Sequence, residues 1–452
     1  MELSADLHSH SMFAGGSGGL STASSSIQEN MKKVHKRFLE ADRNSSLKGI
    51  QIFGSGDIQF SPWLNFFKED FEEEKGLFSY KNGKSNLKYC LQTEIILTAE
   101  MKKNKRKSVH TVVLFPDFTT IEDFKELLGK LDVKQEKLAR PFVVLKDRQA
   151  VSDFLFNVQE IDPLIEIIPA HIMTPEGVFG GNDGVNKLED FFGDFSKESL
   201  HAFETGLSAD PEVLSMIPEL DNKTLISNSD AHSSQLHRIG REFTVLNVQS
   251  ISYNDIIEAI RKKHIAYSLE FPISEGRFFL TGHRAGRKKP GEHTKDQYCF
   301  FSPEHVPEGN ICPICQSKLT IGVLQRAFEI CKFQGESRTL NPTRVSQKYL
   351  HGVPLTEVIA LALNIKSPES KTVFKYYKEI ADVFGNEVSL WRESSSYVEN
   401  NLPLTTPNEI KNTILLIKKN NFSFFPPGFD GTYGTLVVGK KLDYFGHEVI
   451  KN

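Results

Sequence analysis

Residues 5–10 read ADLHSH, a short apolar run that passes directly into two histidines separated by one residue. Side chains alternate between the two faces of a strand, so His8 and His10 point to the same face and can bind one metal ion. The same spacing places Asp230 and His232 of LISNSDAH on one face. Either pair alone is more often a surface pair or a satisfied core pair than a metal site.

More His, Asp and Glu residues stand beside short apolar runs in the first half of the chain. They are Asp57 after IQIFGSG, Glu94 in LQTEI, His110 before TVVLF and His171 after IEIIPA. Imidazole and carboxylate together suit Zn, Mn or Fe, and a carboxylate can bridge two ions. Chance placement of so many such residues is improbable, so we predict one multinuclear hydrolytic centre.

Apolar runs alternate with helical patterns up to about residue 265. The helical patterns cover 27–42, 120–131 and 254–263, and the strands are GIQIF, HTVVLF, IEIIP, HAFET and TLISN. This alternation predicts an α/β fold with a parallel sheet or a (β/α) barrel, where sites form at the carboxyl ends of strands. The residues that follow their runs as this rule requires are His8, Asp57, His171, Glu204 and Asp230. His110 precedes its run and is the exception.

Composition bounds the class of protein. The chain has 452 residues and is 39% hydrophobic, enough for a large core and two or three domains. It shows no apolar stretch near the ~20 residues of a membrane span and no signal-peptide pattern, so we expect a cytoplasmic protein. The net charge of -4 gives no global signal for nucleic acid. Basic runs at 102–107 and 284–289 either follow a phosphate backbone or lie in solvated loops.

From about residue 276 the alternation stops, and a cysteine motif follows. Cys312-Pro313-Ile314-Cys315 is typical of half of a structural zinc site, and Cys299 supplies a third thiolate. The fourth ligand comes from His283, His293 or His305, and we choose His293 for the predicted set. We expect a zinc-knuckle module at 276–320, with the other cysteines, Cys90 and Cys331, in the core. Five cysteines in so long a chain do not indicate a disulfide framework.

Residues 321–452 predict a mainly helical region, from patterns such as IGVLQRAFEICKF and LTEVIALAL. The region closes with FFPPGFDGTYGTLVVG. Such a Gly- and aromatic-rich ending either forms a turn that packs on a partner or stacks on bases, or it fills the core through Phe424, Phe425 and Phe429. A second Gly- and Ser-rich stretch, 14–26, is either a phosphate-binding loop or a connector.

The motifs ADLHSHS, GSGD, TE, VH, IIPAH and SNSDAH, in this order, resemble the metal-binding motifs of the polymerase and histidinol phosphatase (PHP) superfamily. That resemblance implies a distorted (β/α)7 PHP barrel over residues 1–275. IIPAHIMTP, AFETGLSADP, LISNSDAHS followed by IGRE, CPICQSKLTIGVLQR and PGFDGTYG look more closely like the endonuclease Q family. This second resemblance covers most of the chain.

Resemblance to endonuclease Q implies a DNA repair endonuclease that hydrolyses the phosphodiester 5′ to a deaminated base (uracil, hypoxanthine or xanthine) or an abasic site. It would leave a 3′-hydroxyl and a 5′-phosphate. The implied partner is double- or single-stranded DNA with such nucleotides, in the cytoplasm and associated with the nucleoid, with a replication clamp as a further candidate and no membrane. A PHP-type phosphatase and a non-catalytic DNA-binding PHP module are the alternatives. The phosphatase would have no use for the zinc knuckle.

The resemblance also distributes the ligands over Zn2+, Mn2+ or Mg2+ ions in a di- or trinuclear site, besides the structural Zn2+. One ion would take His8, His10, Glu94 and Asp230, a second would share Glu94 and take His110 and His171, and a third would use Asp57 and His232. The chain departs from the family pattern at Phe60, where a His ligand is expected, and at Gly16. A further departure is Phe279, which replaces a candidate ligand near the knuckle.

Catalytic roles follow for Asp57, Glu94, Asp230 and Arg241. Ions that share Glu94, with Asp230 among their ligands, would neutralise the phosphodiester and lower the pKa of a bound water. Asp57 accepts a proton if the third ion is missing. Arg241 is either a phosphate clamp or an arginine paired to Glu242 or to a helix end. Trp63 either stacks on DNA or packs in the barrel.

Overall fold

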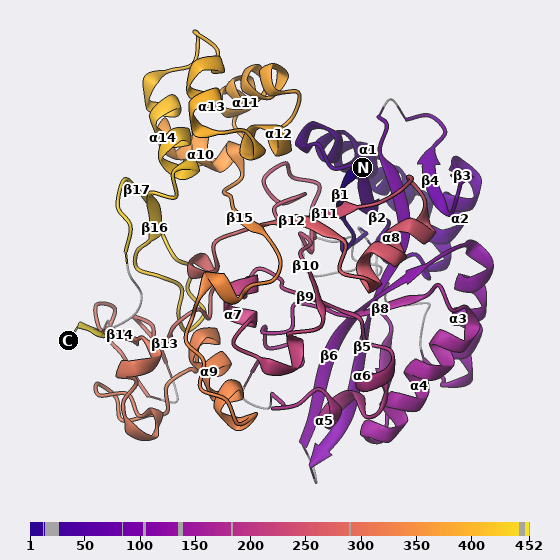
Figure 1. The fold of residues 1–452 in the computed structure, drawn as a ribbon, viewed down its shortest axis with the longest axis horizontal. Coiled ribbons are helices and arrows are strands. Elements are labelled where there is room, and N and C mark those ends of the chain that lie inside the picture. The colour runs from indigo at the N-terminus through magenta and orange to yellow at the C-terminus, as the bar shows by residue number, and fades with distance from the viewer. Residues whose placement is uncertain are drawn as a thin grey trace.

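The computed structural model describes residues 1–11, 13, 27–83, 85–102, 105–133, 139–181, 184–288, 291–442 and 448–451. The Gly- and Ser-rich stretch 14–26, with Gly16, lies outside the described residues. One large sheet with helices around it occupies the right-hand part of Figure 1, and a cluster of C-terminal helices stands apart from it at the upper left. The fold is mixed α/β, as predicted.

The large sheet follows the order β15-β12-β11-β1-β2-β5-β4-β3, with β6 and β7 paired to β5 and β8 paired to β6. Its strands are β1 (Glu2–Asp6), β2 (Ile52–Gly54), β3 (Phe71–Glu74), β4 (Leu77–Tyr80), β5 (Lys88–Lys102), β6 (Lys105–Phe115), β7 (Phe142–Val144), β8 (Glu166–Pro169), β11 (Phe243–Asn247), β12 (Ile265–Glu270) and β15 (Tyr349–His351). A separate parallel pair consists of β9 (Ala202–Glu204) and β10 (Thr224–Ile226). All five predicted strands are confirmed.

The sheet is mixed, whereas a parallel sheet was expected. Strand β2 runs parallel to β1 and β5, and β7 runs parallel to β5. Strand β6 runs antiparallel to both β5 and β8. The reason is the long β5–β6 hairpin, which joins two strands directly and leaves no room for a crossover helix. The prediction of a parallel sheet is therefore wrong at this hairpin, and also where β11 pairs antiparallel with β1 and β12 and where β4 pairs antiparallel with β3 and β5.

The predicted helices are confirmed as α1 (Ile27–Lys48), α3 (Phe118–Lys130) and α8 (Tyr253–Arg261). The remaining helices of the first half are α2 (Ser61–Asp70), α4 (Arg148–Ile161), α5 (Glu189–Phe192), α6 (Phe195–Glu198) and α7 (Pro211–Leu214). Side-chain caps fix several starts: Asp117, Asp147 and Ser252 each accept a hydrogen bond from the backbone N–H three residues on. Among the described residues, no helix is long and apolar enough to cross a membrane.

The C-terminal part adds a small antiparallel sheet of β13 (Thr281–His283), β14 (Tyr298–Phe301) and β18 (Glu448–Lys451). Its helices are α9 (Val323–Phe333), α10 (Leu355–Ala362), α11 (Lys371–Phe384), α12 (Glu387–Arg392), α13 (Ser395–Asn401) and α14 (Asn408–Lys418). A last hairpin joins β16 (Phe422–Phe424) to β17 (Leu436–Val438). Strand β15 of this part pairs with β12, so the large sheet includes a strand from the C-terminal part of the chain.

Residues on both faces of β1 and of the residues that follow it are buried. Leu3, Ala5 and Leu7 alternate along β1 into one apolar cluster. The intervening Asp6 and His8 are also fully buried, on the other side of the strand. Cys90 and Cys331 are buried in two apolar clusters, as predicted.

Candidate functional site

The first group of candidate ligands consists of His8, His10 and Asp230. His8 and His10 follow β1 and Asp230 follows β10. A backbone hydrogen bond of 3.0 Å from the His10 N–H to the Ala231 carbonyl holds the two segments together. Nε2 of His8 lies 3.5 Å, and Nε2 of His10 3.1 Å, from Oδ1 of Asp230. One ligand atom of each residue lies within 4.8 Å of the others, a spacing that suits one metal ion.

A second group consists of Glu94, His110 and His171. Oε1 of Glu94 lies 2.6 Å from Nδ1 of His110 and 3.5 Å from Nε2 of His171. Strand β6 runs antiparallel to β8, so the residues at the start of the apolar run 111–115 lie next to the carboxyl end of β8. There the Ala170 N–H donates to the His110 carbonyl at 3.0 Å. His110 therefore lies with the other candidate ligands although it precedes its apolar run.

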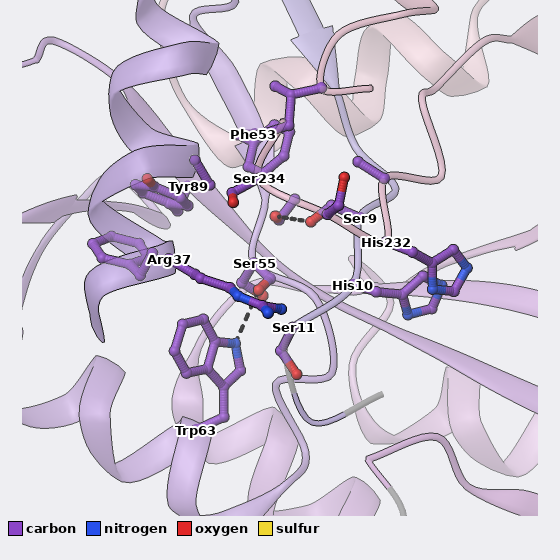
Figure 2. A pocket seen from close by; sticks show the side chains of 16 residues that line it. Ser9, His10, Ser11, Arg37, Phe53, Ser55, Trp63, Tyr89, His232 and Ser234 are labelled. Atoms are coloured by element: carbon purple, nitrogen blue, oxygen red, sulfur yellow. Dashed lines mark hydrogen bonds between the residues drawn. The ribbon is translucent and has the colours of Figure 1, made fainter. Parts of the chain in front are cut away.

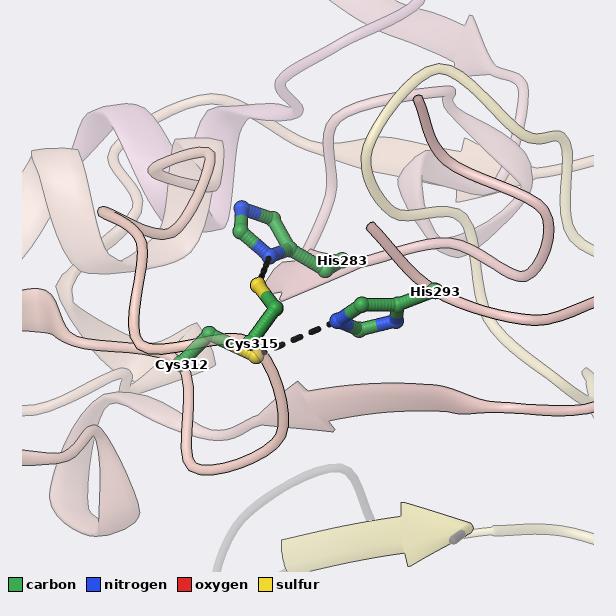
Figure 3. Close-up of side chains that lie close together, drawn as sticks. All are labelled: His283, His293, Cys312 and Cys315. Atoms are coloured by element: carbon green, nitrogen blue, oxygen red, sulfur yellow. Dashed lines mark hydrogen bonds between the residues drawn. The ribbon is translucent and has the colours of Figure 1, made fainter. Parts of the chain in front are cut away.

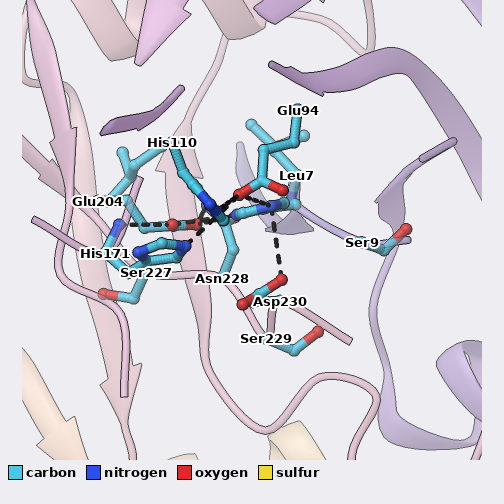
Figure 4. Close-up of polar contacts among 12 residues, drawn as sticks. Leu7, Ser9, Glu94, His110, His171, Glu204, Ser227, Asn228, Ser229 and Asp230 are labelled. Carbon is cyan, nitrogen blue, oxygen red and sulfur yellow. Dashed lines mark hydrogen bonds and ion pairs between the residues drawn. The ribbon is translucent and has the colours of Figure 1, made fainter. Parts of the chain in front are cut away.

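Glu94 joins the two groups into one centre (Figure 4). Its Oε1 is 3.8 Å from Nε2 of His8, and its Oε2 is 3.4 Å from Nε2 of His10. Three buried atoms of the first group have no hydrogen-bond partner within the part of the chain that the structure describes: Nε2 of His8, Nε2 of His10 and Oδ1 of Asp230. Buried polar atoms are normally satisfied, and these three face one another as ligands around a cation would. The residues present therefore fit a metal centre.

The close contacts between imidazoles and carboxylates shift the pKa values of the candidate ligands. Burial alone would lower the pKa of His8, but the carboxylates of Glu204, Asp230 and Glu94 raise it to about 9. Burial alone would raise the pKa of Glu94, but hydrogen bonds with His110 and His171 hold it well below the usual range. Burial opposes the ionised form of Asp230 in the same way, and His8, His10 and His232 lower its pKa. The carboxylates are thus kept ionised, as metal ligands must be.

Two further carboxylates orient the histidines of the first group. Both oxygens of Glu204 lie 3.0 Å from Nδ1 of His8. Oδ1 of Asp57 lies 3.3 Å from Nδ1 of His10, and its Oδ2 accepts hydrogen bonds of 2.7 Å from the N–H and hydroxyl of Ser11. A carboxylate on the second ring nitrogen fixes the tautomer and leaves the other nitrogen free for a metal. The geometry places Asp57 behind His10, whereas a ligand position was expected.

Glu204 contacts two of the candidate ligands, His8 and His171, although the sequence pattern assigned it no role. It is fully buried and also accepts hydrogen bonds of 2.8 Å from the Asn228 amide and 2.9 Å from the His171 N–H. The signal was present, because Glu204 ends a predicted strand as the candidate ligands do.

Backbone conformation at the site is unusual. Asp57, His171 and Asp230 have φ values of 44°, 32° and 45°, in the left-handed region that residues with a side chain rarely adopt. Such strain gathers at functional sites, where the surrounding structure holds it. A Cβ on Gly206 would lie 2.3 Å from Cβ of His171, so a glycine is needed beside this histidine.

Two of the predicted site residues lie beside the ligand groups. His232 stacks on His10, with ring centroids 4.2 Å apart, and its Nε2 lies 3.4 Å from Oδ1 of Asp230, although it belongs to neither ligand group among the described residues. Arg241 is buried over the ring of Phe271 at 3.7 Å, with Nη2 3.2 Å from Oε1 of Glu275. The pairing alternative for Arg241 is therefore favoured over the phosphate clamp, with Glu275 in place of Glu242.

A cleft of about 450 Å³ opens over both ligand groups. His110, His171 and Asp230 lie in its wall, and the arginines that line it are Arg140, Arg238, Arg241 and Arg277. Nη1 of Arg140 lies 3.0 Å from Oε2 of Glu94, a contact between residues from different segments that no sequence pattern indicates. In contrast, Lys107 of the basic run 102–107 is buried and donates to the Gly180 carbonyl at 2.8 Å. Positive charge at the site therefore comes mainly from scattered arginines.

A smaller cavity lies on the other side of His10 and His232, beside α1 and α2 (Figure 2). Its volume is about 60 Å³, room for a few waters. Trp63 lines it, is 4% exposed and donates from its indole to the Ser55 carbonyl at 2.9 Å. Phe60 is also buried and packs against Phe13, with ring centroids 5.0 Å apart. The packing alternative for Trp63 is thus favoured.

The knuckle region contains a third cluster, His283, His293, Cys312 and Cys315 (Figure 3). Nδ1 of His283 lies 3.4 Å from Sγ of Cys315, and Nε2 of His293 lies 3.3 Å from Sγ of Cys312. Two thiols and two imidazoles within 4.8 Å are a donor set that suits zinc.

The set contains His283, whereas Cys299 was the predicted ligand beside His293, Cys312 and Cys315. His283 and Cys299 are direct partners across β13 and β14, so their side chains lie side by side. Sγ of Cys299 is 3.6 Å from Sγ of Cys312 and is buried beside Phe301 and Leu319. Burial raises the pKa of the Cys299 thiol. His305 lies outside the set and its Nδ1 is 3.1 Å from the Ser302 hydroxyl.

Comparisons with known proteins relate the whole chain to one fold. No family model matches. An uncharacterized protein of Methanocaldococcus jannaschii is 30% identical over 253 residues, 54% of this chain, and the chain spans only 29% of that relative's length. An uncharacterized protein of Bacillus subtilis is 26% identical over 410 residues, 87% of this chain and 90% of that protein.

Solved structures match over nearly the full length. The lesion-specific endonuclease PfuEndoQ from Pyrococcus furiosus superposes with a TM-score of 0.73 at 24% identity, over 96% of this chain and 95% of that chain. A complex of Endonuclease Q with a 27-mer duplex substrate that has an abasic lesion at the active site gives a TM-score of 0.71 at 24% identity, over 96% of both chains. The chain therefore has the fold of the endonuclease Q structures.

Proposed function

We propose that this protein is a metal-dependent DNA repair endonuclease of the endonuclease Q type. The observation that carries the proposal is the position of Glu94, which joins two groups of metal ligands at the wall of an arginine-lined cleft. Two ligand groups with a shared carboxylate are typical of hydrolysis at phosphate, where attacking and leaving oxygens both need positive charge. The fold adds support, because the matching structures include an abasic duplex at the active site.

The proposed ligands of one ion are His8, His10 and Asp230, and those of a second are Glu94, His110 and His171, with Glu94 shared. Bound divalent ions, Zn2+, Mn2+ or Mg2+, would neutralise the phosphodiester and make a water acidic enough to attack at neutral pH. We propose two ions in place of the predicted three, because Asp57 faces Nδ1 of His10 and His232 stacks on the same ring. Asp57 then acts by holding His10, as Glu204 holds His8.

The chain's other residues position the substrate. Arg238 and Arg277 line the cleft, where their guanidinium groups would bind nonbridging oxygens of the DNA backbone. Arg140, on Oε2 of Glu94, lies beside the ligands and would contact the phosphate nearest to them. In this proposal the cut falls 5′ to uracil, hypoxanthine, xanthine or an abasic site and gives a 3′-hydroxyl and a 5′-phosphate.

We also propose the finer organisation that this function implies. Residues 1–275 would form the distorted (β/α)7 PHP barrel, 276–320 a zinc module held by His283, His293, Cys312 and Cys315, and 321–452 the mainly helical C-terminal region. The protein would act in the cytoplasm on nucleoid DNA, double- or single-stranded, with a replication clamp as a candidate partner.

The experiment compares strand cleavage of duplexes that contain uracil, hypoxanthine or an abasic site with an undamaged duplex, in Mn2+ or Mg2+. The wild-type protein should nick 5′ to the lesion, and Asp230→Asn should lower the rate roughly 100-fold or more. His201→Ala is the matched control, because His201 also has a carboxylate partner, Glu166 at 3.2 Å, but lies outside the site. Intact DNA with every lesion, from protein that has bound its metal, would overturn the proposal.

A further inference from the structure

The Gly- and aromatic-rich segment 427–434, PGFDGTYG, lies against residues 274–277 beside the cleft. Backbone hydrogen bonds of 2.8–2.9 Å join them: the Gly428 N–H donates to the Ser274 carbonyl, the Gly431 N–H to Arg277 and the Gly434 N–H to Glu275. These residues are more than 150 positions apart in the sequence. The segment is thus docked by its main chain to the wall of the candidate site.

Glycines make this close contact feasible. A Cβ on Gly428 would lie 1.8 Å from the Gly276 carbonyl oxygen, and one on Gly434 would lie 2.6 Å from the Ser274 carbonyl oxygen. Gly431 has a φ of 86°, a conformation that other residues rarely adopt. The backbone on both sides of Tyr433 is therefore held against residues 274–277.

Tyr433 is exposed while the other aromatic residue of the segment is buried. Phe429 is 4% exposed, whereas Tyr433 is 59% exposed and lines the same cleft as His110, His171 and Asp230. The guanidinium of Arg277 lies 5.6 Å from the Tyr433 ring centre and 5.8 Å from that of Phe278. The Tyr433 ring, the Arg277 guanidinium and the Phe278 ring thus lie together at the cleft. Core packing explains the position of Phe429 but not that of Tyr433.

We infer that Tyr433, supported by Arg277 and Phe278, is a stacking platform for an unpaired base or exposed deoxyribose next to the cleaved phosphate. Aromatic rings beside arginine are the usual contact for unstacked nucleotides, since every base has an aromatic face and the cation attracts the backbone. A lesion weakens pairing and stacking locally, so the nucleotides around it are the ones available for such a contact. The inference rests on the proposed function, because it assumes that a DNA strand occupies the cleft.

The test measures DNA binding without cleavage, in chelator, by fluorescence anisotropy of an abasic duplex. A 2-aminopurine placed on either side of the lesion reports stacking. Tyr433→Ala should weaken binding about tenfold and abolish the 2-aminopurine quenching, whereas Tyr433→Phe should keep both. Tyr397→Ala is the matched control, because Tyr397 is 49% exposed on α13 and does not line the cleft. Unchanged thermal stability of Tyr433→Ala would show that the fold is retained.

The outcomes separate the two proposals. If the wild-type protein cuts DNA and Tyr433→Ala binds and quenches like the wild type, the platform is wrong and the endonuclease stands. If the wild-type protein binds abasic DNA in a Tyr433-dependent way but never cuts it with metal added, the platform stands and the endonuclease is wrong. DNA that fails to bind the wild-type protein overturns the platform as well.

Discussion

Glu204 holds His8 through both of its carboxylate oxygens, each 3.0 Å from Nδ1 of the ring. Both residues are fully buried, and Nε2 of His8 is left pointing at Asp230 and Glu94. A buried carboxylate in this position holds the proton on Nδ1, so that Nε2 is the nitrogen that loses its proton when a metal binds. The pair therefore sets which nitrogen of His8 can bind a metal.

Removal of this carboxylate should weaken metal binding without removing a ligand. We expect Glu204→Gln to lower catalytic-metal affinity or activity by 10–100-fold, the usual effect of losing a carboxylate behind a histidine ligand. Added Mn2+ should restore part of the activity of this variant, and titration with the metal measures it. Equal metal affinity and activity in Glu204→Gln and wild type would contradict the orienting role.

Asp57 offers a test of the number of ions. If Asp57 only orients His10, Asp57→Asn should bind as many metal ions per chain as the wild type, with reduced activity. Elemental analysis of metal per chain, after removal of excess ion, makes the comparison. A ligand role for Asp57 in a third site predicts one ion fewer, and Asp230→Asn serves as the variant that should lose an ion in either case.

The residue types of the site were readable in the sequence because each one ends or begins a local apolar run. Their roles were less readable, because a role depends on which atom faces which neighbour. Asp57 was expected on a metal but lies behind a histidine, and Glu204 received no role although it follows the same pattern. Arg140 comes from a segment without any motif and meets Glu94 only through the tertiary fold. The direction of β6 could not be predicted either, because an apolar run does not indicate whether a strand pairs parallel or antiparallel.

A buried carboxyl group away from the ligands predicts a pH dependence of stability. Burial raises the pKa of Glu270 from 4.5 to about 7, although the hydroxyls of Ser227 and Ser268 donate to it and oppose the shift. The folded state then binds one more proton than the unfolded state between these values. This contribution to stability is complete below about pH 4.5 and is lost as pH rises towards 7.

Glu270→Gln, which stays neutral, should reduce this dependence, although burial and the neighbouring Glu270 also raise the pKa of Glu242. We expect the melting temperature of the wild type to fall more between pH 5.5 and 7.5 than that of Glu270→Gln, measured by calorimetry in the same buffers. Glu258→Gln is the control, because Glu258 lies on α8 and its carboxylate is exposed beside Lys262. Parallel melting curves for all three proteins over this range would contradict the raised pKa.

The knuckle cluster distinguishes His283 from Cys299 as a zinc ligand. Nδ1 of His283 lies 3.4 Å from Sγ of Cys315, whereas Cys299 lies behind Cys312 in an apolar environment that favours its neutral thiol. We expect His283→Ala to lose the structural zinc and to melt at a lower temperature, because a structural zinc contributes directly to folding. Cys299→Ala should keep its zinc and lose only the packing of one buried side chain. The measurement that decides between His283 and Cys299 is the amount of zinc per chain in both variants. Cys312→Ala is the control, because it certainly loses a thiolate of the cluster. Loss of zinc from Cys299→Ala with retention in His283→Ala would restore the ligand set expected from the sequence.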